Sequence, residues 1–406
     1  MSIRAAAQAG AKGKSQREVE GHLRLEALGL EAEFTLALDG LATQPERLFT
    51  DPRDFLPNPA MHRVGTSYHL PNGGAVYFDT GVVEVVTPAM EIERGTAVRA
   101  GRSLWESIAL VRDALDRWEA RSGRRLSLAG FSTHYNISVE AGTRRLDRLA
   151  RLLTYILPAP VMLLAANRRS TGIGVRPRVT RIEVTADFTP DAALQVAAAT
   201  LIAAIVRQVA RWPSWTLAEA RRRGVPILEG YAPRAHTSRQ GWLAKDDTYP
   251  RNPFTTSPDA RVWATAGNPS AMSLREIAVR TFRVFRLPIA RVADPFSLRL
   301  IAAVLDGRGT SLLDLPDRPA TYDDVGRLCR WTTVFPARFL RRSRYERVLM
   351  LAIAGVPLEI EGREYHPIGM RGWSRVVLFN PAANQTRVLT IDALVPYLDR
   401  WDDANG

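Results

Sequence analysis

Apolar and polar residues alternate along four segments of the chain, which is typical of strands with one dry face and one polar face. Side chains two residues apart share a face of a strand. Applied to Leu30–Leu36, Val76–Thr87, Gly130–Val139 and Arg181–Phe188, this rule predicts four polar faces. They carry Glu31 and Glu33, then Tyr77 and Asp79 with Glu84 beyond the bend at Gly81, then His134 and Asn136, and lastly Arg181 and Glu183.

Helical spacing of apolar residues predicts an amphipathic helix over Ala97–Arg121 and a mostly buried, alanine-rich helix over Asp191–Trp212. Further helical segments are expected over 146–167, interrupted near Pro158 and Pro160, over 274–285, and over 321–354. Strand-like pieces at 375–379 and 386–391 follow the last of these. The sequence therefore predicts a flexible basic tail (1–21), a main domain (22–320) and a small C-terminal domain (321–406).

Composition and length limit the class of protein. The chain has 406 residues, and 46% of them are hydrophobic, enough for a substantial core. Its longest apolar run, Val196–Val206, is shorter than the roughly 20 residues that span a bilayer, and the N-terminus lacks the apolar centre of a secretory signal. We therefore expect no membrane segment and a cytoplasmic location. The single cysteine, Cys329, excludes an internal disulfide framework and a cysteine-based zinc site.

The net charge of +13 comes almost entirely from arginine, since lysine occurs only at positions 12, 14 and 245. Such a bias is more typical of a GC-rich coding sequence than of a surface that binds nucleic acid, so no nucleic-acid partner is expected. An acidic protein partner is compatible with this charge.

The polar faces are unusual because they collect acids rather than the lysine, threonine and glutamine of an ordinary solvated strand. Grouped together, these carboxylates would repel one another unless cations lay among them. Oxygen ligands with one imidazole and no thiol suit Mg²⁺ or Mn²⁺. The chain has no GxxxxGK loop and no GxGxxG before a helix, so a nucleotide would be held by metal ions and arginines, with Arg168, Arg169 and Arg181 the nearest candidates.

The order of these motifs resembles a known family. Glu-x-Glu, NGGAVYFDTGVVEVVTPAME, STHYNIS, NRRS, RIEVTADFTPD and AGNPSAMSLREIAVRTF follow one another between about residues 25 and 290. This order is similar to that of the glutamine-synthetase-related carboxylate-amine ligases, and most of all to their Pup ligase and Pup deamidase (depupylase) group. The resemblance implies an α+β, glutamine-synthetase-like fold: a curved, mainly antiparallel sheet backed by helices. It also implies ATP and Mg²⁺.

The resemblance assigns roles to individual residues. Asp79 corresponds to the family's catalytic aspartate, and Arg169 to an arginine expected to contact ATP phosphate. Asn136 and Arg181, on the polar strand faces, are further candidates for nucleotide contact. Residues expected to bind metal are Glu31, Glu33, Glu84, His134 and Glu183. The sequence departs from the family at Glu183, where the family has a histidine, and in the segments VEVVTPAM and ADFT, so substrate contacts differ.

The implied activity is ATP-dependent attachment of a small acidic Pup-like modifier to lysines of target proteins. Three alternatives stay open: a deamidase or isopeptidase acting on the same modifier, a small-molecule glutamate–amine ligase, and a binding protein without activity. The segment between Glu33 and Asp79 is short, whereas the deamidase branch carries an extra loop there, which favours the ligase. His236 and Trp242 could lie over a nucleotide, although a solvated loop and core packing are the simpler interpretations.

Overall fold

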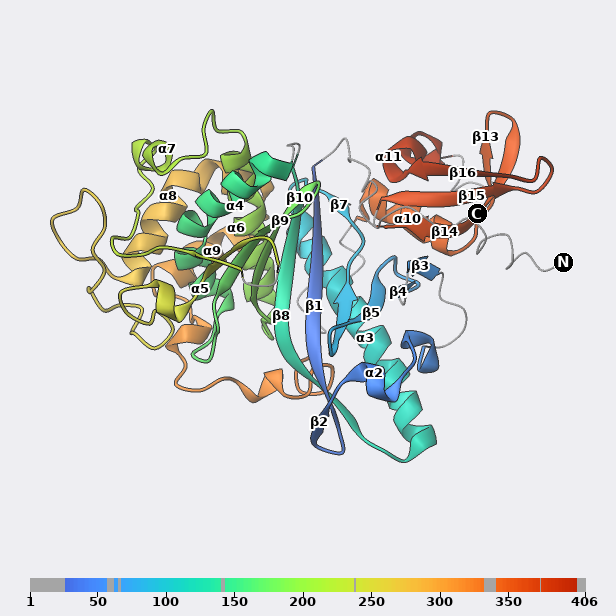
Figure 1. Ribbon diagram of the computed structural model, residues 1–406, viewed down its shortest axis with the longest axis horizontal. Helices are drawn as coiled ribbons and strands as arrows, with labels where there is room; N and C mark the ends of the chain where they lie inside the picture. Colours follow the sequence, from blue (N-terminus) through green and yellow to red (C-terminus); the bar gives the residue numbers. More distant parts are fainter. Residues whose placement is uncertain are drawn as a thin grey trace.

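The protein consists of a large sheet covered by helices and a smaller sheet near the C-terminus (Figure 1). The computed structural model describes residues 26–56, 62–64, 67–139, 143–236, 239–331, 341–372 and 374–399. The predicted tail, 1–21, lies outside these residues. The predicted α+β architecture, with a mainly antiparallel sheet backed by helices and a small C-terminal unit, is confirmed.

The large sheet has twelve strands in the order β11-β12-β9-β10-β8-β1-β6-β5-β4-β3, with β2 and β7 paired to the ends of β1. All of these named strands pair antiparallel. Their bounds are β1 (Ala27–Leu38), β2 (Leu41–Thr43), β3 (His62–Val64), β4 (Ser67–His69), β5 (Ala75–Asp79), β6 (Val82–Val86), β7 (Met90–Glu91), β8 (Leu126–Ser138), β9 (Ile173–Pro177), β10 (Arg181–Asp187), β11 (Arg234–Ala235) and β12 (Trp242–Ala244).

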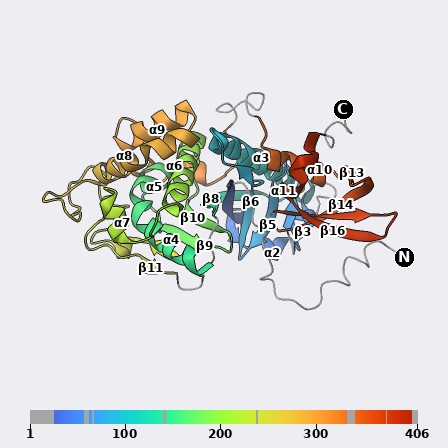
Figure 2. The ribbon, with the colours of Figure 1, turned by 90° about the horizontal axis from the view of Figure 1, so that it is seen from above.

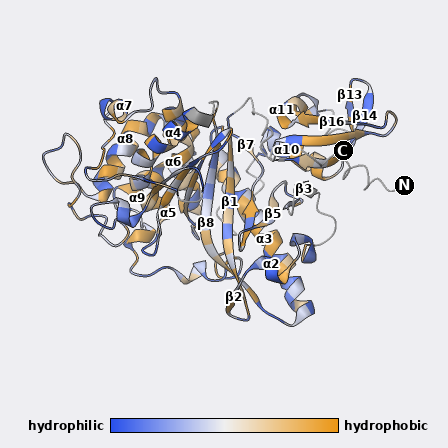
Figure 3. Cartoon of the chain, in the orientation of Figure 1, coloured by the Kyte–Doolittle hydropathy of each residue, from blue (hydrophilic) through white to orange (hydrophobic). Residues whose placement is uncertain are grey.

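The two faces of the sheet differ as the alternation predicts. In β1, Leu30, Ala32 and Phe34 are fully buried in the core, while Glu31 and Glu33 lie on the opposite face. Figure 3 shows hydrophilic and hydrophobic residues along both β1 and β8. The dry face is therefore fixed by burial of apolar side chains, and the polar face is left for chemistry.

A β-bulge resets this alternation in β8. Glu33 pairs with Ser132 and Phe34 with Gly130, so Phe131 is the extra residue. Beyond the bulge, even-numbered residues such as Leu128 enter the core, and Phe131 is 56% exposed. The bulge thus lets both halves of a thirteen-residue strand keep their apolar side chains in one core.

Helices cover the dry face. Their bounds are α2 (Pro45–Leu48), α3 (Thr96–Ser122), α4 (Thr143–Ile156), α5 (Pro158–Ala165), α6 (Ala192–Ala210), α7 (Leu217–Arg222), α8 (Leu274–Val292) and α9 (Pro295–Leu305). The helices predicted over 97–121, 191–212 and 274–285 are confirmed. The last one continues through Pro288 to Val292, because its apolar face still packs on the core there.

Helix α6 is the one helix of the described residues that is long and apolar enough to cross a membrane; Arg145–Ile156 and α5 pass the same test only as a pair, bent by 65°. Most of α6 is buried within the protein, where it contacts α3, α8 and α9. Core packing therefore accounts for its apolar composition.

The C-terminal body consists of α10 (Arg344–Ile353), β13 (Leu358–Ile360), β14 (Arg363–Arg371), β15 (Arg375–Asn380), β16 (Gln385–Thr390) and α11 (Ile391–Leu394). It lies at the opposite end of the molecule from α8 and α9, with β1 and β8 between them (Figure 2). Its core includes Tyr345 and Val348, and also Ala27 from the start of β1. A buried ion pair joins it to α3, with Arg99 Nε 3.0 Å from Glu346 Oε2.

The prediction of a helical stretch over 321–354 is wrong for most of its described residues. After a short 3₁₀ turn at Ala320–Tyr322 the chain is irregular as far as Trp331, and the helix begins only at Arg344, where Ser343 and Glu346 form a capping box. Tyr322 and Trp331 instead pack singly in the main core, where Trp331 stacks on Phe188 at 6.0 Å. Along this part of the chain, the main core includes residues up to Trp331, and the core of the C-terminal body includes residues from Tyr345.

Candidate active site

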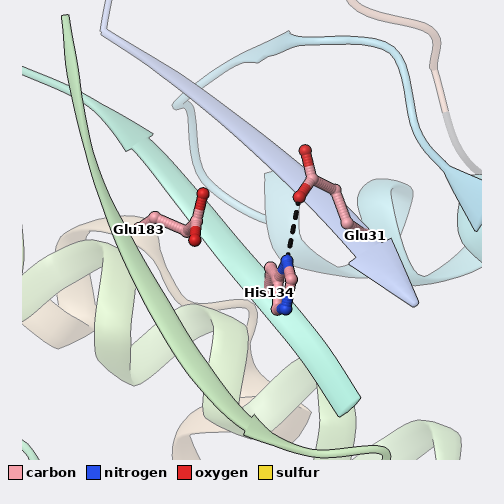
Figure 4. A group of neighbouring side chains, drawn as sticks. All are labelled: Glu31, His134 and Glu183. Carbon is pink, nitrogen blue, oxygen red and sulfur yellow. Dashed lines mark hydrogen bonds and ion pairs between the residues drawn. The ribbon is translucent and has the colours of Figure 1, made fainter. Parts of the chain in front are cut away.

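The centre of the polar face is formed by Glu31 and His134, which are paired across β1 and β8. The Nδ1 atom of His134 lies 3.1 Å from Glu31 Oε2, and both side chains are buried (Figure 4). Burial alone would raise the pKa of Glu31, but the hydrogen bond with His134 and the charges of His134 and Arg181 hold it well below its usual value. Glu31 is therefore the carboxyl group whose charged form His134 and Arg181 favour.

A second row of polar side chains lies one step along the sheet. Glu33 pairs with Glu84 of β6 and with Ser132 of β8, and the Ser132 hydroxyl donates to Glu33 Oε2 at 2.5 Å. His134 Nε2 is 3.4 Å from Glu33 Oε1, and His134 Nδ1 is 3.9 Å from Glu84 Oε1. One imidazole thus contacts carboxylates from both rows.

The pKa of Glu84 moves in the opposite direction to that of Glu31. Burial, and then the negative charge of Glu31, raise the pKa of Glu84 well above its usual value. The two carboxyl groups share a hydrogen bond. For His134, burial alone would lower the pKa, but the hydrogen bond to Glu31 and the charges of Glu33, Glu31 and Glu183 raise it. The raised pKa values favour the protonated forms of Glu84 and His134, which offset negative charge that a bound cation could also offset.

Glu183 of β10 reaches the same centre from the other side. It forms an ion pair with Arg176 of β9, and Arg178 Nε donates to Glu183 Oε2 at 2.8 Å. Burial alone would raise the pKa of Glu183, but His134 and these two arginines lower it. The opposing residue in β8, Asn136, accepts a hydrogen bond from Arg181 Nε at 2.8 Å. The Nε atom of Arg176 and the Nδ2 atom of Asn136 are buried without a hydrogen-bond partner in the described structure.

Two overlapping sets of side chains could hold a metal ion. Glu31, His134 and Glu183 form one set, with their ligand atoms within 4.8 Å of one another. Glu33, Glu84 and His134 form the other, with the same spacing. Carboxylate oxygens with one imidazole suit Mg²⁺ or Mn²⁺, and Glu84 in particular needs either a proton or a cation in its buried position. The donor set therefore fits a divalent cation.

Asp79 lies apart from these sets, at the tip of the β5–β6 hairpin. Its side chain is 40% exposed, and it lies 3.5 Å from Arg239 Nη2. The Thr80 hydroxyl donates to Asp79 Oδ1 at 2.9 Å. Asp79 shares a strand face with Tyr77, which pairs with Glu84 and hydrogen-bonds to it. The structure thus places Asp79 on the same face as the metal-binding candidates, near its solvent-facing rim.

Arg169 is not brought into this group. It lies in the loop after α5, its side chain is exposed, and its backbone amide donates to the Asn167 side chain. Arg168 donates to the carbonyl oxygens of Phe254 and Thr255. No hydrogen bond or ion pair within the described ranges links either guanidinium to the carboxylates. A phosphate contact by Arg169 stays a prediction.

Sequence inspection missed the arginines that hold Glu183. Arg176 and Arg178 lie in and just after β9, whose run Ile173–Pro177 is too short for its alternation to be recognised. It also missed Asp187, at the end of β10, which accepts from the Asn167 amide and from Ser170 Oγ. Burial raises the pKa of Asp187 from 3.8 to about 6. The tertiary positions of these residues, rather than any motif, reveal them.

The two residues considered for a nucleotide contact have other partners. Trp242 Nε1 donates to Asp147 at 3.1 Å, and the Arg151 guanidinium lies 4.8 Å from the ring centre. His236 accepts a hydrogen bond at Nδ1 from the Arg239 amide at 3.0 Å. Burial and the neighbouring charges of Arg176 and Arg239 lower its pKa. Trp242 is therefore engaged in packing, and His236 lies close to the arginines of the site.

Comparisons with known proteins give a similarity to solved structures. No protein-family model matches the chain, and no curated protein matches it. Among solved structures, the chain is similar to the crystal structure of the complex between the prokaryotic ubiquitin-like protein Pup and its ligase PafA. The match has 15% sequence identity and a TM-score of 0.42, and it covers 94% of each chain. At this identity the chain differs from it at most positions, and the site has to be judged on its own geometry.

Proposed function

We propose that this protein is an ATP- and Mg²⁺-dependent ligase that attaches a glutamate carboxylate of a small acidic Pup-like modifier to lysine side chains. The observation that carries the proposal is the convergence of four buried glutamates around one histidine on a polar sheet face. Such a set of hard ligands suits the divalent cation that accompanies nucleotide phosphates.

The candidate metal ligands have distinct tasks in this proposal. Glu33, Glu84 and His134 would hold one cation, and Glu31 with Glu183 would complete a second site beside it. When bound, the cation supplies neutralisation of phosphate charge. Arg176 and Arg178 already balance Glu183, and they add positive charge at the same edge of the site.

The chemistry has two steps. The donor carboxylate attacks the γ-phosphorus of ATP, the bond to ADP breaks, and an acyl phosphate forms. The lysine nitrogen then attacks the acyl carbon, phosphate leaves, and an isopeptide bond remains. A lysine ammonium must lose its protons for this attack, and Asp79 is the carboxylate placed to accept one of them because it faces solvent on the polar side of the sheet.

The partial exposure of Asp79 also suits the reverse reaction. A water molecule could reach the same carboxylate and cleave an amide or isopeptide bond of the modifier, as a deamidase would. A small-molecule ligase would use free glutamate with the same residues. These are the alternative outcomes of the experiment below.

The proposed partner is acidic because the chain carries a net charge of +13. Opposite charge speeds encounter between proteins and favours the right partner over others. We place the reaction in the cytoplasm, where ATP and Mg²⁺ are available.

Mass spectrometry of a reconstituted reaction tests the proposal. The protein is incubated with a Pup-like modifier, Mg·ATP and a lysine-bearing target, and a conjugate heavier by the modifier less water is expected. The Glu33→Gln and Glu84→Gln variants should form none, whereas Glu364→Gln, at an exposed glutamate of β14, should react normally. Loss of ammonia from the modifier instead would indicate the deamidase. ATP turnover with free glutamate would indicate the small-molecule ligase. Failure to bind Mg·ATP in calorimetry would leave only a binding protein.

A further inference from the structure

Arg239 and Asp79 meet although they belong to distant parts of the large sheet. Arg239 lies between β11 and β12, and Asp79 ends β5. Five strands, β9, β10, β8, β1 and β6, separate β12 from β5 in the sheet. The 3.5 Å contact between Arg239 Nη2 and Asp79 Oδ2 therefore spans the polar face. The sheet is curled enough for the two edges of the site to touch.

The β5–β6 hairpin that carries Asp79 is held at its turn by a residue of α2. Thr80 and Gly81 have positive φ angles of 52° and 90°, as in a two-residue hairpin turn, and the Gly81 amide donates to Glu46 Oε1 at 2.9 Å. The backbone that carries Asp79 is thus held at the turn, and Arg239, on its long side chain, is the partner that can move.

Three arginines, Arg176, Arg178 and Arg239, gather at this edge of the site. Burial lowers the pKa of Arg176, and the charges of Arg178 and then Arg239 lower it further against the opposing charge of Glu183, so Arg239 lies close enough for the two guanidinium groups to repel each other. Gly241 packs on Arg176 so closely that a Cβ would come within 2.8 Å of its Cγ. Glu183 is the carboxylate shared by Arg176 and Arg178, and the buried Nε of Arg176 has no hydrogen-bond partner within the described residues. An anion that docks at this edge would therefore find three guanidinium groups and one buried N–H donor without a partner among the described residues.

We propose that Arg239 is an anion-sensing positioning residue: it pairs with Asp79 in the free protein and leaves it for a phosphate or carboxylate of the acyl donor that docks beside Arg176. This inference deepens the proposed function and rests on it for the role of Asp79. Both side chains of the pair are more than one-third exposed, so their contact is weak and a bound anion can compete for Arg239.

The exchange would set the order of binding. While Arg239 lies against Asp79, its positive charge repels a lysine ammonium. Once Arg239 turns to the anion, the Asp79 carboxylate can accept a proton from the ammonium, and the resulting amine attacks the acyl phosphate. The products are the amide, hydrogen phosphate and one proton, initially held by Asp79. The acyl donor would therefore bind before the amine.

A double-mutant cycle measured by calorimetry tests the inference without any activity assay. Inorganic pyrophosphate and Mg·ATP are titrated separately into the full chain and into Arg239→Gln, Asp79→Asn and the double variant. Asp79→Asn should tighten anion binding about two- to five-fold, because Arg239 no longer has a competing partner. Arg239→Gln should weaken it about tenfold. In the Arg239→Gln background, Asp79→Asn should change nothing.

Arg234→Gln is the matched control and should leave anion affinity unchanged. Arg234 lies in β11, on the same hairpin as Arg239, and forms a similarly exposed ion pair with Asp247. Unchanged or weaker anion binding by Asp79→Asn would overturn the inference. The inference would also be overturned if Asp79→Asn tightened binding equally in the Arg239→Gln background, or if the unchanged protein bound neither pyrophosphate nor Mg·ATP. If pyrophosphate follows the cycle but Mg·ATP does not bind, Arg239 is the anion sensor and the ligase proposal fails. If both anions follow the cycle and no conjugate forms, Arg239 is still the anion sensor and only the ligase proposal fails.

Discussion

Glu33 and Glu84 lie directly opposite each other in β1 and β6, and both are buried. Like charges held close together in a buried site disfavour each other's ionised form. Burial, and then the charge of Glu31, raise the pKa of Glu84, and the charge of Glu33 adds to this rise. The pair therefore behaves as a site whose charge depends on what it binds.

Replacement of Glu84 by glutamine should separate metal binding from folding. The pKa of Glu84 is raised in the folded protein, so its stabilising contribution is complete below the unfolded value of 4.5 and is lost as pH rises through the folded value. Without metal, Glu84→Gln should therefore melt at a higher temperature than the unchanged protein, by a margin that grows above pH 4.5. Mg²⁺ or Mn²⁺ should raise the melting temperature of the unchanged protein only. Melting curves in EDTA and in each metal check this, and an equal metal response in both proteins would contradict it.

Asp187 should give a second pH dependence in a different window. Its pKa is raised from 3.8 to about 6, so its contribution to the free energy of unfolding is lost between these values as pH rises. A shift of about two units corresponds to about 3 kcal/mol. The amide of Asp187→Asn can still accept from the Asn167 amide and donate to Ser170. In this variant the fall in unfolding free energy between the two pKa values of Asp187 should be absent. Urea unfolding at pH 4 and pH 7 measures it, and parallel pH profiles would refute the assignment.

Asp79→Asn should slow conjugation strongly while sparing the nucleotide site. Loss of a general base costs about 10²- to 10⁴-fold in rate. Mg·ATP affinity should not fall, because Asp79 belongs to neither candidate metal set. Single-turnover conjugation and calorimetry on the same preparation give both values. Asp306→Asn, a carboxylate at the end of α9 that pairs with Arg308, serves as the control and should conjugate at the normal rate. A normal rate for Asp79→Asn would remove Asp79 from the mechanism.

The ion pair between Arg99 and Glu346 should be costly to break from one side. Both side chains are buried, and Glu346 also caps α10. Glu346→Gln removes the buried counter-charge and leaves only Glu106, 3.7 Å from the guanidinium, so a loss of about 3 kcal/mol in unfolding free energy is expected. The double change Arg99→Met with Glu346→Leu should recover part of it. Guanidinium unfolding measures each variant. Glu361→Gln, which breaks an exposed pair with Arg387, should cost less than about 1 kcal/mol.

Local pattern was enough to place the carboxylates on one face. Alternation over a few residues determines the face of Glu31 and Glu33, and the same holds for His134 and Glu183, because strand geometry is set by the backbone itself. The partners of these residues depend on pairing between distant segments. Arg176 lies opposite Glu183 through the β9–β10 register, which no local pattern reveals.

Local pattern failed where tertiary packing decides the conformation. The apolar residues of 322–331 have a spacing that resembles a helix. Four of them nevertheless enter the main core singly, and Leu328 is exposed. The proline at 288 predicts a helix end, yet burial of Ile289 and Val292 keeps α8 going. Arg239 reached the site through a loop, and its contact with Asp79 depends on the curl of the whole sheet.

Ala27, the first residue of β1, lies in the core of the C-terminal body. It comes four positions before Glu31 and five before Ala32, which pairs with Val85. The strand that carries the central carboxylate is thus anchored at one end by residues more than 300 positions later in the chain. Until α10 and its sheet have formed, Ala27 has no core to enter. The geometry of the carboxylates and the packing of the C-terminal body are therefore coupled, although no residue of that body belongs to either candidate metal set.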